Sequence, residues 1–356
     1  MPTVPTLQGI TSRMIQTPRL KIHALFKGED SGAPVLFIHG NAASATFWEE
    51  LMLGLPEGLR GIAPDLRGYG DTEDKLIDAT GGADDWVNDL LALMKSLGIE
   101  HYHLVGHSMG GQIASNLIAA DGARILSATL VDPSPIYGFG GTKDIYGTPC
   151  YPDYAGSGGG IVNQEFTQLM AKGDRSSDNP QASPRVVMNS FYWKPPFVPE
   201  REEDLLSSLL TEKVGPEKYP GDFVPSENWP NVAPGVYGPV NAFSPKYAGD
   251  APQRFIHADP KPPVLWIRGD SDQIVSEMSL FDFGALGKLG AIPGWPGEEV
   301  FPPQPMVSQT RYLLEQYAAK GGEFQEVVIA DSGHTPFIDQ AEKFRKVFYP
   351  FLEKKG

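Results

Sequence analysis

The residues best suited to chemistry in this sequence are a serine and the glycines beside it, in the run Gly106-His107-Ser108-Met109-Gly110. An apolar run ends at Val105, and residues 112–120 have helical spacing. A serine on a sharp turn between a strand and a helix exposes its hydroxyl, and flanking glycines remove side chains that would collide there. The N–H groups at the start of the helix point toward any anion that forms beside the serine. This pattern predicts that Ser108 is a nucleophile.

A serine hydroxyl is a weak nucleophile until a base removes its proton. The chain has seven histidines, and His334 lies in a segment that follows the apolar run Val327–Ile329. If that run is a parallel strand, His334 lies at its carboxyl end, where the sites of open α/β sheets collect. His107 is the variable residue inside the glycine-flanked turn. The position therefore favours His334 as the base.

The base needs a carboxylate that fixes its tautomer and stabilises its protonated form. Asp272 comes three residues after Gly269, just past the run Val264–Ile267. Asp132 directly follows the run Ala128–Val131. Both positions put a carboxylate at the carboxyl edge of a sheet, so position alone leaves the choice between the two aspartates open.

These residues depend on a scaffold of strands and helices. Short, continuously apolar runs have the length of strands that are buried on both faces. Helical spacing occurs at residues 86–97, with Gly98 as a C-terminal cap, and at 344–352, where we expect Pro350 to bend or end the helix. Strands that alternate with helices predict an α/β fold with a mostly parallel central sheet flanked by helices. The runs are Val35–Ile38, His103–Val105, Ala128–Val131, Val264–Ile267 and Val327–Ile329, preceded by a predicted antiparallel pair at one edge, Thr11–Gln16 and Arg19–Phe26.

The prolines divide the chain. Most of the 33 prolines lie between Pro133 and Pro263, and a second group lies between Pro293 and Pro305. Proline interrupts helices and sheet ladders, so these stretches are predicted to be loop-rich insertions in the scaffold. We expect a core in two parts with a cap or lid between them: core residues 1–132 and 263–356, a cap at 133–262, and a proline-rich insertion at about 277–308.

Composition limits the partners and the location. The 356 residues carry a formal net charge of −15, which argues against a nucleic acid or an anionic membrane surface as partner. Cys150 is the single cysteine, so an intramolecular disulfide is excluded, and no metal-binding or Walker pattern occurs, so we expect no metal and no cofactor. The chain shows no signal-peptide pattern and no apolar run of roughly 20 residues, which favours the cytoplasm. The sequence leaves the oligomeric state open.

Five segments resemble, in order, the motifs of the α/β-hydrolase superfamily. They lie at about residues 20–132 and 263–352, whereas the middle third carries no such motif. The resemblance implies the α/β-hydrolase fold with a large inserted cap or lid. The segments are His39-Gly40-Asn41-Ala42, Asp65-Leu66-Arg67-Gly68-Tyr69-Gly70, Gly106-His107-Ser108-Met109-Gly110, Gly269-Asp270-Ser271-Asp272 and Ser332-Gly333-His334.

The resemblance also implies roles for single residues. It favours Asp272 as the acid, because the usual pattern of the superfamily is Gly-x-x-Asp, although some relatives take the acid from the position of Asp132. It places the two donors of an oxyanion hole at the backbone N–H groups of Met109 and Asn41, and the Asn41 side chain can donate as well. The turn at residues 65–70 is interpreted as structural.

A serine at this turn indicates acyl chemistry, because dehalogenase and epoxide-hydrolase relatives carry an aspartate there. We therefore expect hydrolysis of a small-molecule carboxylic ester or lactone. Cleavage of amide or peptide, thioester or carbon–carbon bonds and cofactor-free peroxidation use the same residues and stay open as alternatives, as does a small-molecule receptor with residual hydrolysis. The aromatic-rich insertion predicts a pocket for a bulky apolar or aromatic group, with Trp193 and Trp229 as candidate lining residues.

Overall fold

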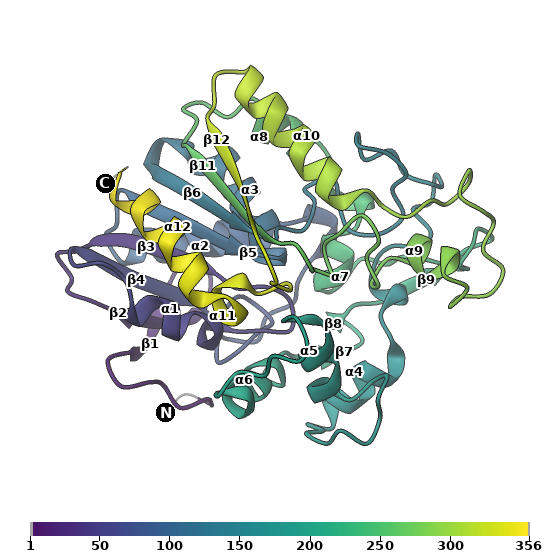
Figure 1. The fold of residues 1–356 in the computed structure, drawn as a ribbon, viewed down its shortest axis with the longest axis horizontal. Helices are drawn as coiled ribbons and strands as arrows, with labels where there is room; N and C mark the ends of the chain where they lie inside the picture. Colours follow the sequence, from purple (N-terminus) through teal and green to yellow (C-terminus); the bar gives the residue numbers. More distant parts are fainter. Residues whose placement is uncertain (1–2, 355–356) are drawn as a thin grey trace.

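An eight-stranded sheet forms the centre of the computed structural model, which describes residues 3–354 (Figure 1). The strand order is β1-β2-β4-β3-β5-β6-β11-β12. The pairs β1–β2 and β2–β4 are antiparallel, and all other neighbours in this sheet are parallel. This confirms the predicted mostly parallel sheet with an antiparallel pair at one edge. The strands are β1 (Thr11–Gln16), β2 (Lys21–Lys27), β3 (Ala33–Ile38), β4 (Leu59–Pro64), β5 (Tyr102–His107), β6 (Ile125–Val131), β11 (Val264–Gly269) and β12 (Phe324–Ile329).

The apolar runs of the sequence do not indicate β4, because Arg60, Gly61 and Pro64 interrupt its pattern. The strand nevertheless pairs with β2 and β3. A Cβ on Gly61 would lie 2.9 Å from the side chain of Met52, so the glycine lets helix α1 (Glu49–Leu53) pack closely on the strand. Packing against neighbours therefore determines this strand where the local pattern is weak.

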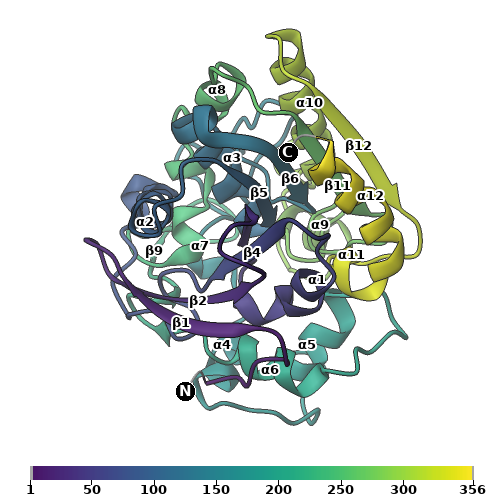
Figure 2. The ribbon, with the colours of Figure 1, turned by 90° about the vertical axis from the view of Figure 1, so that its left-hand side faces the viewer.

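Helices cover both faces of the sheet, which explains why its central strands are continuously apolar. The edge strand β12 is only partly buried, with Val328 exposed, so the prediction that Val327–Ile329 is buried on both faces is wrong. In β3, Leu36 and Ile38 join the core beneath α2 and α3, whereas Val35 and Phe37 join the core beneath α1 and α12. Figure 2 shows α2, α3 and α8 on one side of the sheet and α1, α11 and α12 on the other. None of the helices within residues 3–354 has the length and apolar character that a membrane crossing needs. These helices are α2 (Asp84–Ser96), α3 (Met109–Asp121), α8 (Ala251–Ile256), α11 (Pro336–Asp339) and α12 (Ala341–Glu353).

Helix α12 continues through Pro350 to Glu353, so the expectation that Pro350 could end the helix is wrong. Phe344, Phe348 and Leu352 lie on one side of α12 and are buried in the core. A proline this close to the end of a helix removes one backbone hydrogen bond, and burial of the aromatic face compensates for that loss.

Residues 132–263, between β6 and β11, contain short helices and two small two-stranded sheets. In Figure 1, α4, α5, α6 and α7 gather to one side of the central sheet. Helix α8, at the end of this segment, packs with α3 and α10 on the face of the sheet instead. The elements are α4 (Gln164–Ala171), α5 (Pro184–Phe191), α6 (Glu202–Leu209), β7 (Val214–Gly215), β8 (Tyr219–Pro220), β9 (Phe223–Pro225), β10 (Val232–Pro234) and α7 (Pro239–Ala242).

The segment between β11 and β12 carries α9 (Phe283–Lys288) and α10 (Met306–Ala319). The proline-rich part of this segment is hydrogen-bonded to the first insertion, the segment between β6 and β11. The side chain of Gln304 accepts a hydrogen bond from the N–H of Gly140 at 2.6 Å and donates to the carbonyl of Gly138 at 2.8 Å. The Trp229 indole N–H donates to the carbonyl of Pro293 at 3.0 Å. The two proline-rich segments therefore form one continuous layer.

Candidate active site

Ser108 lies at the turn between β5 and α3 with φ 55° and ψ −121°, a backbone region that is strained for any residue but glycine. Its N–H donates to the carbonyl of Val131 at 2.9 Å, which fixes the turn to the neighbouring strand. A Cβ on Gly106 would lie 2.3 Å from the carbonyl oxygen of Gly110, and a Cβ on Gly110 would lie 2.4 Å from that of Ile38. Both flanking glycines are therefore required for this turn.

His334 and Asp272 form a buried pair, with side chains that are 3% and 2% exposed. The Nδ1–H of His334 donates to Oδ2 of Asp272 at 2.8 Å. The backbone N–H groups of Ile274 and Val275 donate to Oδ1 of the same carboxylate at 2.7 and 3.1 Å and hold it in place. Because a carboxylate only accepts, the proton of the neutral ring lies on Nδ1, and Nε2 is left as the basic nitrogen.

Asp132, the alternative acid, lies next to this pair but does not form the hydrogen bond to the imidazole. One oxygen from each of Asp132 and Asp272 and a ring nitrogen of His334 lie within 4.8 Å of one another. The N–H of Gly269 donates to Oδ1 of Asp132 at 3.0 Å, while Oδ2 is buried without a hydrogen-bond partner among the described residues. Burial and the neighbouring charge of Asp272 raise the pKa of Asp132 well above its usual value. Asp132 therefore lies beside the pair without contacting the imidazole, and its surroundings disfavour its charged form.

Ser108 and His334 line the same cavity, although they come from the ends of β5 and β12. Within residues 3–354, no hydrogen bond joins the Ser108 hydroxyl to the His334 ring. Such bonds are often long in ligand-free structures and shorten when substrate binds. The structure thus brings the predicted nucleophile, base and acid to one edge of the sheet.

His107 has a role that the sequence did not indicate. Its Nε2–H donates to the backbone carbonyl of His334 at 2.7 Å, and the two rings lie 4.7 Å apart. Burial lowers the pKa of His107 well below its usual value, so the ring is neutral. The residue before the nucleophile therefore holds the loop that carries the base, a contact across 227 positions that no local pattern reveals.

The two predicted oxyanion donors lie beside the serine, and both residues line the cavity. Met109 is the first residue of α3, where a helix leaves the N–H without an intrahelical partner. Asn41 follows Gly40, whose Cβ position lies only 3.0 Å from Cβ of Ser108, so this loop packs directly on the serine turn. The ring of His39 fixes the loop by donating to the Gly40 carbonyl at 2.8 Å and accepting from the Leu66 N–H at 3.0 Å.

The turn at residues 65–70 packs against the site and contacts both α2 and the oxyanion residues. Arg67 forms a two-pronged ion pair with Asp89 of α2, at 2.8 and 2.9 Å, which fits the predicted structural role. Tyr69 also contacts residues of the site, which the sequence did not indicate. Its hydroxyl donates to Oδ1 of Asn41 at 2.8 Å and also lies 3.2 Å from the sulfur of Met109. Tyr69 therefore contacts the side chains of both predicted oxyanion residues.

The cavity in front of Ser108 has a volume of about 480 Å³, and its walls are mostly apolar. The carboxyl edge of the sheet forms its floor, and the two insertions form its walls. None of the described residues that line it is Lys, Arg, Asp or Glu. Its aromatic and large aliphatic lining comes from Phe139, Ile161, Val162, Phe166, Val187, Phe191, Tyr192, Tyr219, Val240, Phe243, Ile274, Leu280, Phe281, Phe283 and Leu286.

Trp193 and Trp229, the candidate pocket residues, do not line this cavity. Trp193 is fully buried, and its backbone packs so closely against Gly333 that a Cβ there would lie 2.6 Å away. Trp229 packs its ring 4.9 Å from Phe301, in the layer between the two insertions. The prediction is therefore wrong for these two residues, because tryptophans that anchor the insertions are held away from the cavity.

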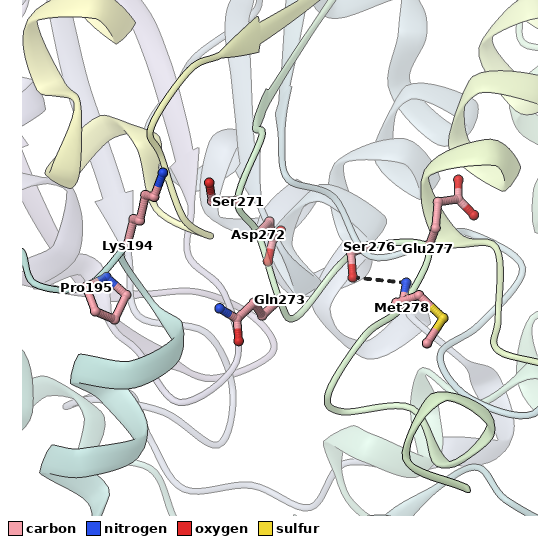
Figure 3. Close-up of a pocket in the computed structure, with 8 residues that line it drawn as sticks. All are labelled: Lys194, Pro195, Ser271, Asp272, Gln273, Ser276, Glu277 and Met278. Atoms are coloured by element: carbon pink, nitrogen blue, oxygen red, sulfur yellow. Dashed lines mark hydrogen bonds between the residues drawn. The ribbon is translucent and has the colours of Figure 1, made fainter. Parts of the chain in front are cut away.

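A second, open groove of about 690 Å³ lies on the outer side of the loop after β11 (Figure 3). Figure 3 shows Lys194 and Pro195 across from this loop and the hydrogen bond from the Met278 N–H to the Ser276 hydroxyl. The groove borders Asp272 but includes neither the serine nor the histidine of the candidate site. We therefore take the cavity as the candidate active site.

Within residues 3–354, two groups of side chains bring possible metal ligands within 4.8 Å of one another. One is Asp132, Asp272 and His334, described above. The other is His23, Asp65 and Asp71, in which the ring of His23 donates to Asp65 at 2.6 Å and the Asp71 N–H donates to the same oxygen. The hydrogen bonds inside each group account for its geometry.

Cys150 lies apart from the site. It is half-buried, and burial raises the pKa of its thiol to about 12. A thiol with this pKa is not a nucleophile near neutral pH.

Comparison with known proteins places this geometry in a family. The model of the alpha/beta hydrolase family matches residues 35–347. The chain is 38% identical over 109 residues to epoxide hydrolase 2 of Siraitia grosvenorii and 37% identical over 107 residues to 2-hydroxymuconate semialdehyde hydrolase of Pseudomonas sp. strain CF600. These matches cover 30% and 29% of this chain and 34% and 38% of the relatives' own lengths.

Among solved structures, a putative aryl esterase of Burkholderia cenocepacia is similar with a TM-score of 0.60 at 19% identity, over 97% of this chain and 99% of that one. A likeness at this identity concerns the fold, which is the predicted α/β-hydrolase fold. The family match spans most of the sequence, including every strand from Val35 onward. The chain therefore belongs to the alpha/beta hydrolase family.

Proposed function

We propose that this hydrolase cleaves a carboxylic ester or lactone that carries a bulky apolar or aromatic group, through an acyl-enzyme on Ser108. The observation that carries the proposal is the strained serine that lines one apolar cavity together with a histidine whose Nδ1 is held by Asp272. This is the arrangement of nucleophile, base and orienting acid that acyl transfer requires.

In the proposed reaction, Nε2 of His334 takes the hydroxyl proton as Oγ of Ser108 bonds to the substrate carbonyl carbon. The carbonyl oxygen becomes negatively charged and accepts hydrogen bonds from the N–H groups of Asn41 and Met109. The tetrahedral intermediate collapses, the bond to the alcohol oxygen breaks, and the alcohol leaves with the proton from His334. Water then attacks the acyl-enzyme by the same steps and releases the acid.

The nucleophile argues against epoxide opening and dehalogenation, which the names of some relatives suggest. Attack by a serine oxygen on an epoxide or alkyl halide carbon forms an ether, which has no carbonyl for water to attack. The enzyme would be blocked after one turnover. A serine that becomes acylated is released by hydrolysis, so acyl substrates suit Ser108.

The cavity argues for an uncharged substrate. A free carboxylate on the substrate would need a cation or several donors to replace its hydration. The described lining residues offer no Lys or Arg, and the net charge of −15 repels anions at long range. This observation favours esters over carbon–carbon cleavage of an acid such as the one named for the Pseudomonas relative.

The test is a series of 4-nitrophenyl esters that differ only in the acyl group, from acetyl to phenyl-substituted acyl chains, with kcat/KM as readout. We expect kcat/KM to rise with apolar bulk and to fall when the same chain ends in a carboxylate. Ser276→Ala, in the groove of Figure 3, is the control and keeps wild-type kinetics. A preference for acetyl esters or for the acidic chain would contradict the proposed substrate class.

A further inference from the structure

Tyr192, a residue of the first insertion, is hydrogen-bonded to the oxyanion loop, residues 39–42, although the proposed reaction gives it no role. It directly follows α5, is 8% exposed and lines the cavity beside Phe191. Its hydroxyl donates to the backbone carbonyl of Ala42 at 3.0 Å and lies 3.4 Å from the carbonyl of Asn41. A carbonyl only accepts, so the hydroxyl is the donor in this contact.

Ala42 is the strained residue of the oxyanion loop. Its φ is 46°, in the left-handed region that is unfavourable for a residue with a Cβ. The φ and ψ of a residue set the relative orientation of the two peptide planes that it joins. The carbonyls of Asn41 and Ala42 belong to these two planes, and both approach the one hydroxyl of Tyr192. The hydroxyl therefore holds Ala42 in its strained conformation.

The peptide plane on the other side of Asn41 is held as well. The ring of His39 donates to the carbonyl of Gly40 at 2.8 Å, and this carbonyl shares a planar peptide bond with the N–H of Asn41. Hydrogen bonds thus fix both peptide planes that flank Asn41, one from within the loop and one from the insertion. The position of the predicted donor N–H depends on both.

The backbone around Tyr192 is in turn bound to the loop that carries the base. The hydroxyl of Thr335, the residue after the predicted base, donates to the carbonyl of Tyr192 at 2.6 Å. The carboxylate of Asp339 accepts from the N–H of Lys194 at 3.0 Å and from the N–H of Gly333 at 2.7 Å. One short segment of the insertion therefore contacts the loop of the base and the loop of the oxyanion donor.

We propose that Tyr192 is a positioning residue for the oxyanion hole: its hydroxyl holds Ala42 at positive φ and so keeps the N–H of Asn41 directed at the substrate oxygen that becomes negatively charged. The proposal rests on the proposed acyl chemistry at Ser108. Because the backbone of Tyr192 is bound to the loop of His334, the insertion aligns the two catalytic loops in addition to enclosing the cavity.

The experiment measures how fast a fluorophosphonate probe with a phenyl-substituted alkyl group labels Ser108, because the phosphoryl oxygen of the probe occupies the oxyanion hole. A series of probe concentrations separates the maximal labelling rate, kinact, from the concentration for half that rate, KI. The variants are Tyr192→Phe, which loses only the hydroxyl, Ala42→Gly, and the double variant. Tyr247→Phe is the matched control, since this tyrosine of the same insertion donates to the carbonyl of Gly235 at 2.6 Å and neither residue lines the cavity.

We expect Tyr192→Phe to lower kinact at least tenfold, since the loss of one oxyanion donor costs on the order of 10²–10³-fold and this change displaces one. KI stays within about twofold of wild type, because the ring remains in the cavity wall. Glycine adopts positive φ without the penalty of a Cβ, so the double variant labels within about threefold of Ala42→Gly alone. Tyr247→Phe labels as wild type does, and melting temperatures check that each variant folds.

The proposal is overturned if Tyr192→Phe keeps the kinact of wild type or changes KI alone, since Tyr192 would then be only a part of the cavity wall. It is also overturned if the hydroxyl matters as much in the Ala42→Gly background as in wild type, because a hydroxyl that contacts the probe directly is needed equally in both. Probe labelling is independent of the natural substrate. Rapid labelling of Ser108 in wild type without turnover of any ester would contradict the proposed function, and the Tyr192 series would still test the positioning role.

Discussion

At the scale of single residues, the site contains two buried carboxyl groups beside one imidazole, and their hydrogen-bond partners distinguish them. Asp272 receives two backbone N–H groups and the Nδ1–H of His334, which stabilise its charged form. Asp132 receives one N–H, from Gly269, and burial together with the charge of Asp272 raises its pKa. Their roles follow from the number of donors that each one receives.

This difference predicts unequal effects of two matched substitutions. Asp272→Asn removes the acceptor that holds Nδ1–H, and we expect kcat for the best ester to fall on the order of 10⁴-fold. Asp132→Asn keeps the hydrogen bond from Gly269 and changes a side chain that does not hold the imidazole, so kcat falls far less. Steady-state kinetics of both variants, with circular dichroism to check the fold, gives the comparison. The reverse ranking would make Asp132 the acid.

Glu212, which follows α6 and is buried, predicts a pH dependence of stability with a definite sign. Its pKa is raised in the folded state above the value of about 4.5 expected in the unfolded chain, so its contribution to stability is fully present below pH 4.5. That contribution is lost as the pH rises toward the folded pKa, because folding must then take up a proton. We expect Glu212→Gln to melt at a higher temperature than wild type at pH 8 and at about the same temperature at pH 4. A wild type that is the more stable at pH 8 would show that Glu212 is charged in the fold.

At the scale of elements, the turn between β5 and α3 depends on glycines that admit no side chain. Gly110→Ala puts a methyl group 2.4 Å from the Ile38 carbonyl oxygen, and this backbone cannot move without displacing β3. We expect a loss of at least about 3 kcal/mol of unfolding free energy, as for other overpacked or strained sites. Gly215→Ala is the control, since the nearest atom to its Cβ, on the flexible Lys218 side chain, is 3.8 Å away. Chemical denaturation compares the two, and equal stability would contradict this account of the turn.

The elements also show what a sequence pattern can predict. Strands β3, β5, β6 and β11 contain continuous apolar runs because helices cover both faces of the sheet, so their pattern alone revealed them. Strand β4 and the helix through Pro350 depend on packing by distant segments, which no local pattern records. The same holds at the site. Ser108 and His334 stand in recognisable local motifs, whereas His107 acts through a contact across 227 positions.

At the scale of the whole molecule, two proline-rich insertions enclose an apolar cavity over a sheet edge that carries the polar groups. Tertiary packing selects which aromatics face that cavity, which is why Trp193 and Trp229 were wrong predictions. Phe191, on α5, lines the cavity and packs its ring 5.1 Å from Phe281, which also lines it. The walls therefore come from both insertions together.

This arrangement predicts that side chains of the two insertions determine the preference for esters with a bulky acyl group. Phe191→Ala enlarges the cavity, and we expect kcat/KM for the bulkiest good ester to fall at least tenfold while that for the acetyl ester changes little. Phe197→Ala, on an aromatic that is 36% exposed and outside the cavity, is the matched control. A uniform loss across all esters would place the effect of Phe191 on stability or chemistry instead of fit.

The central claim is that the molecule works through an acyl group on Ser108. It is tested most directly by the intact mass of the protein, acid-quenched milliseconds after mixing with a 4-nitrophenyl ester of a phenyl-substituted acid. We predict a mass increase of one acyl group, located by peptide mapping on Ser108, formed with one equivalent of released 4-nitrophenol and absent from Ser108→Ala. Ester turnover by Ser108→Ala at a tenth of the wild-type rate, or an acyl group on any other residue, would contradict it.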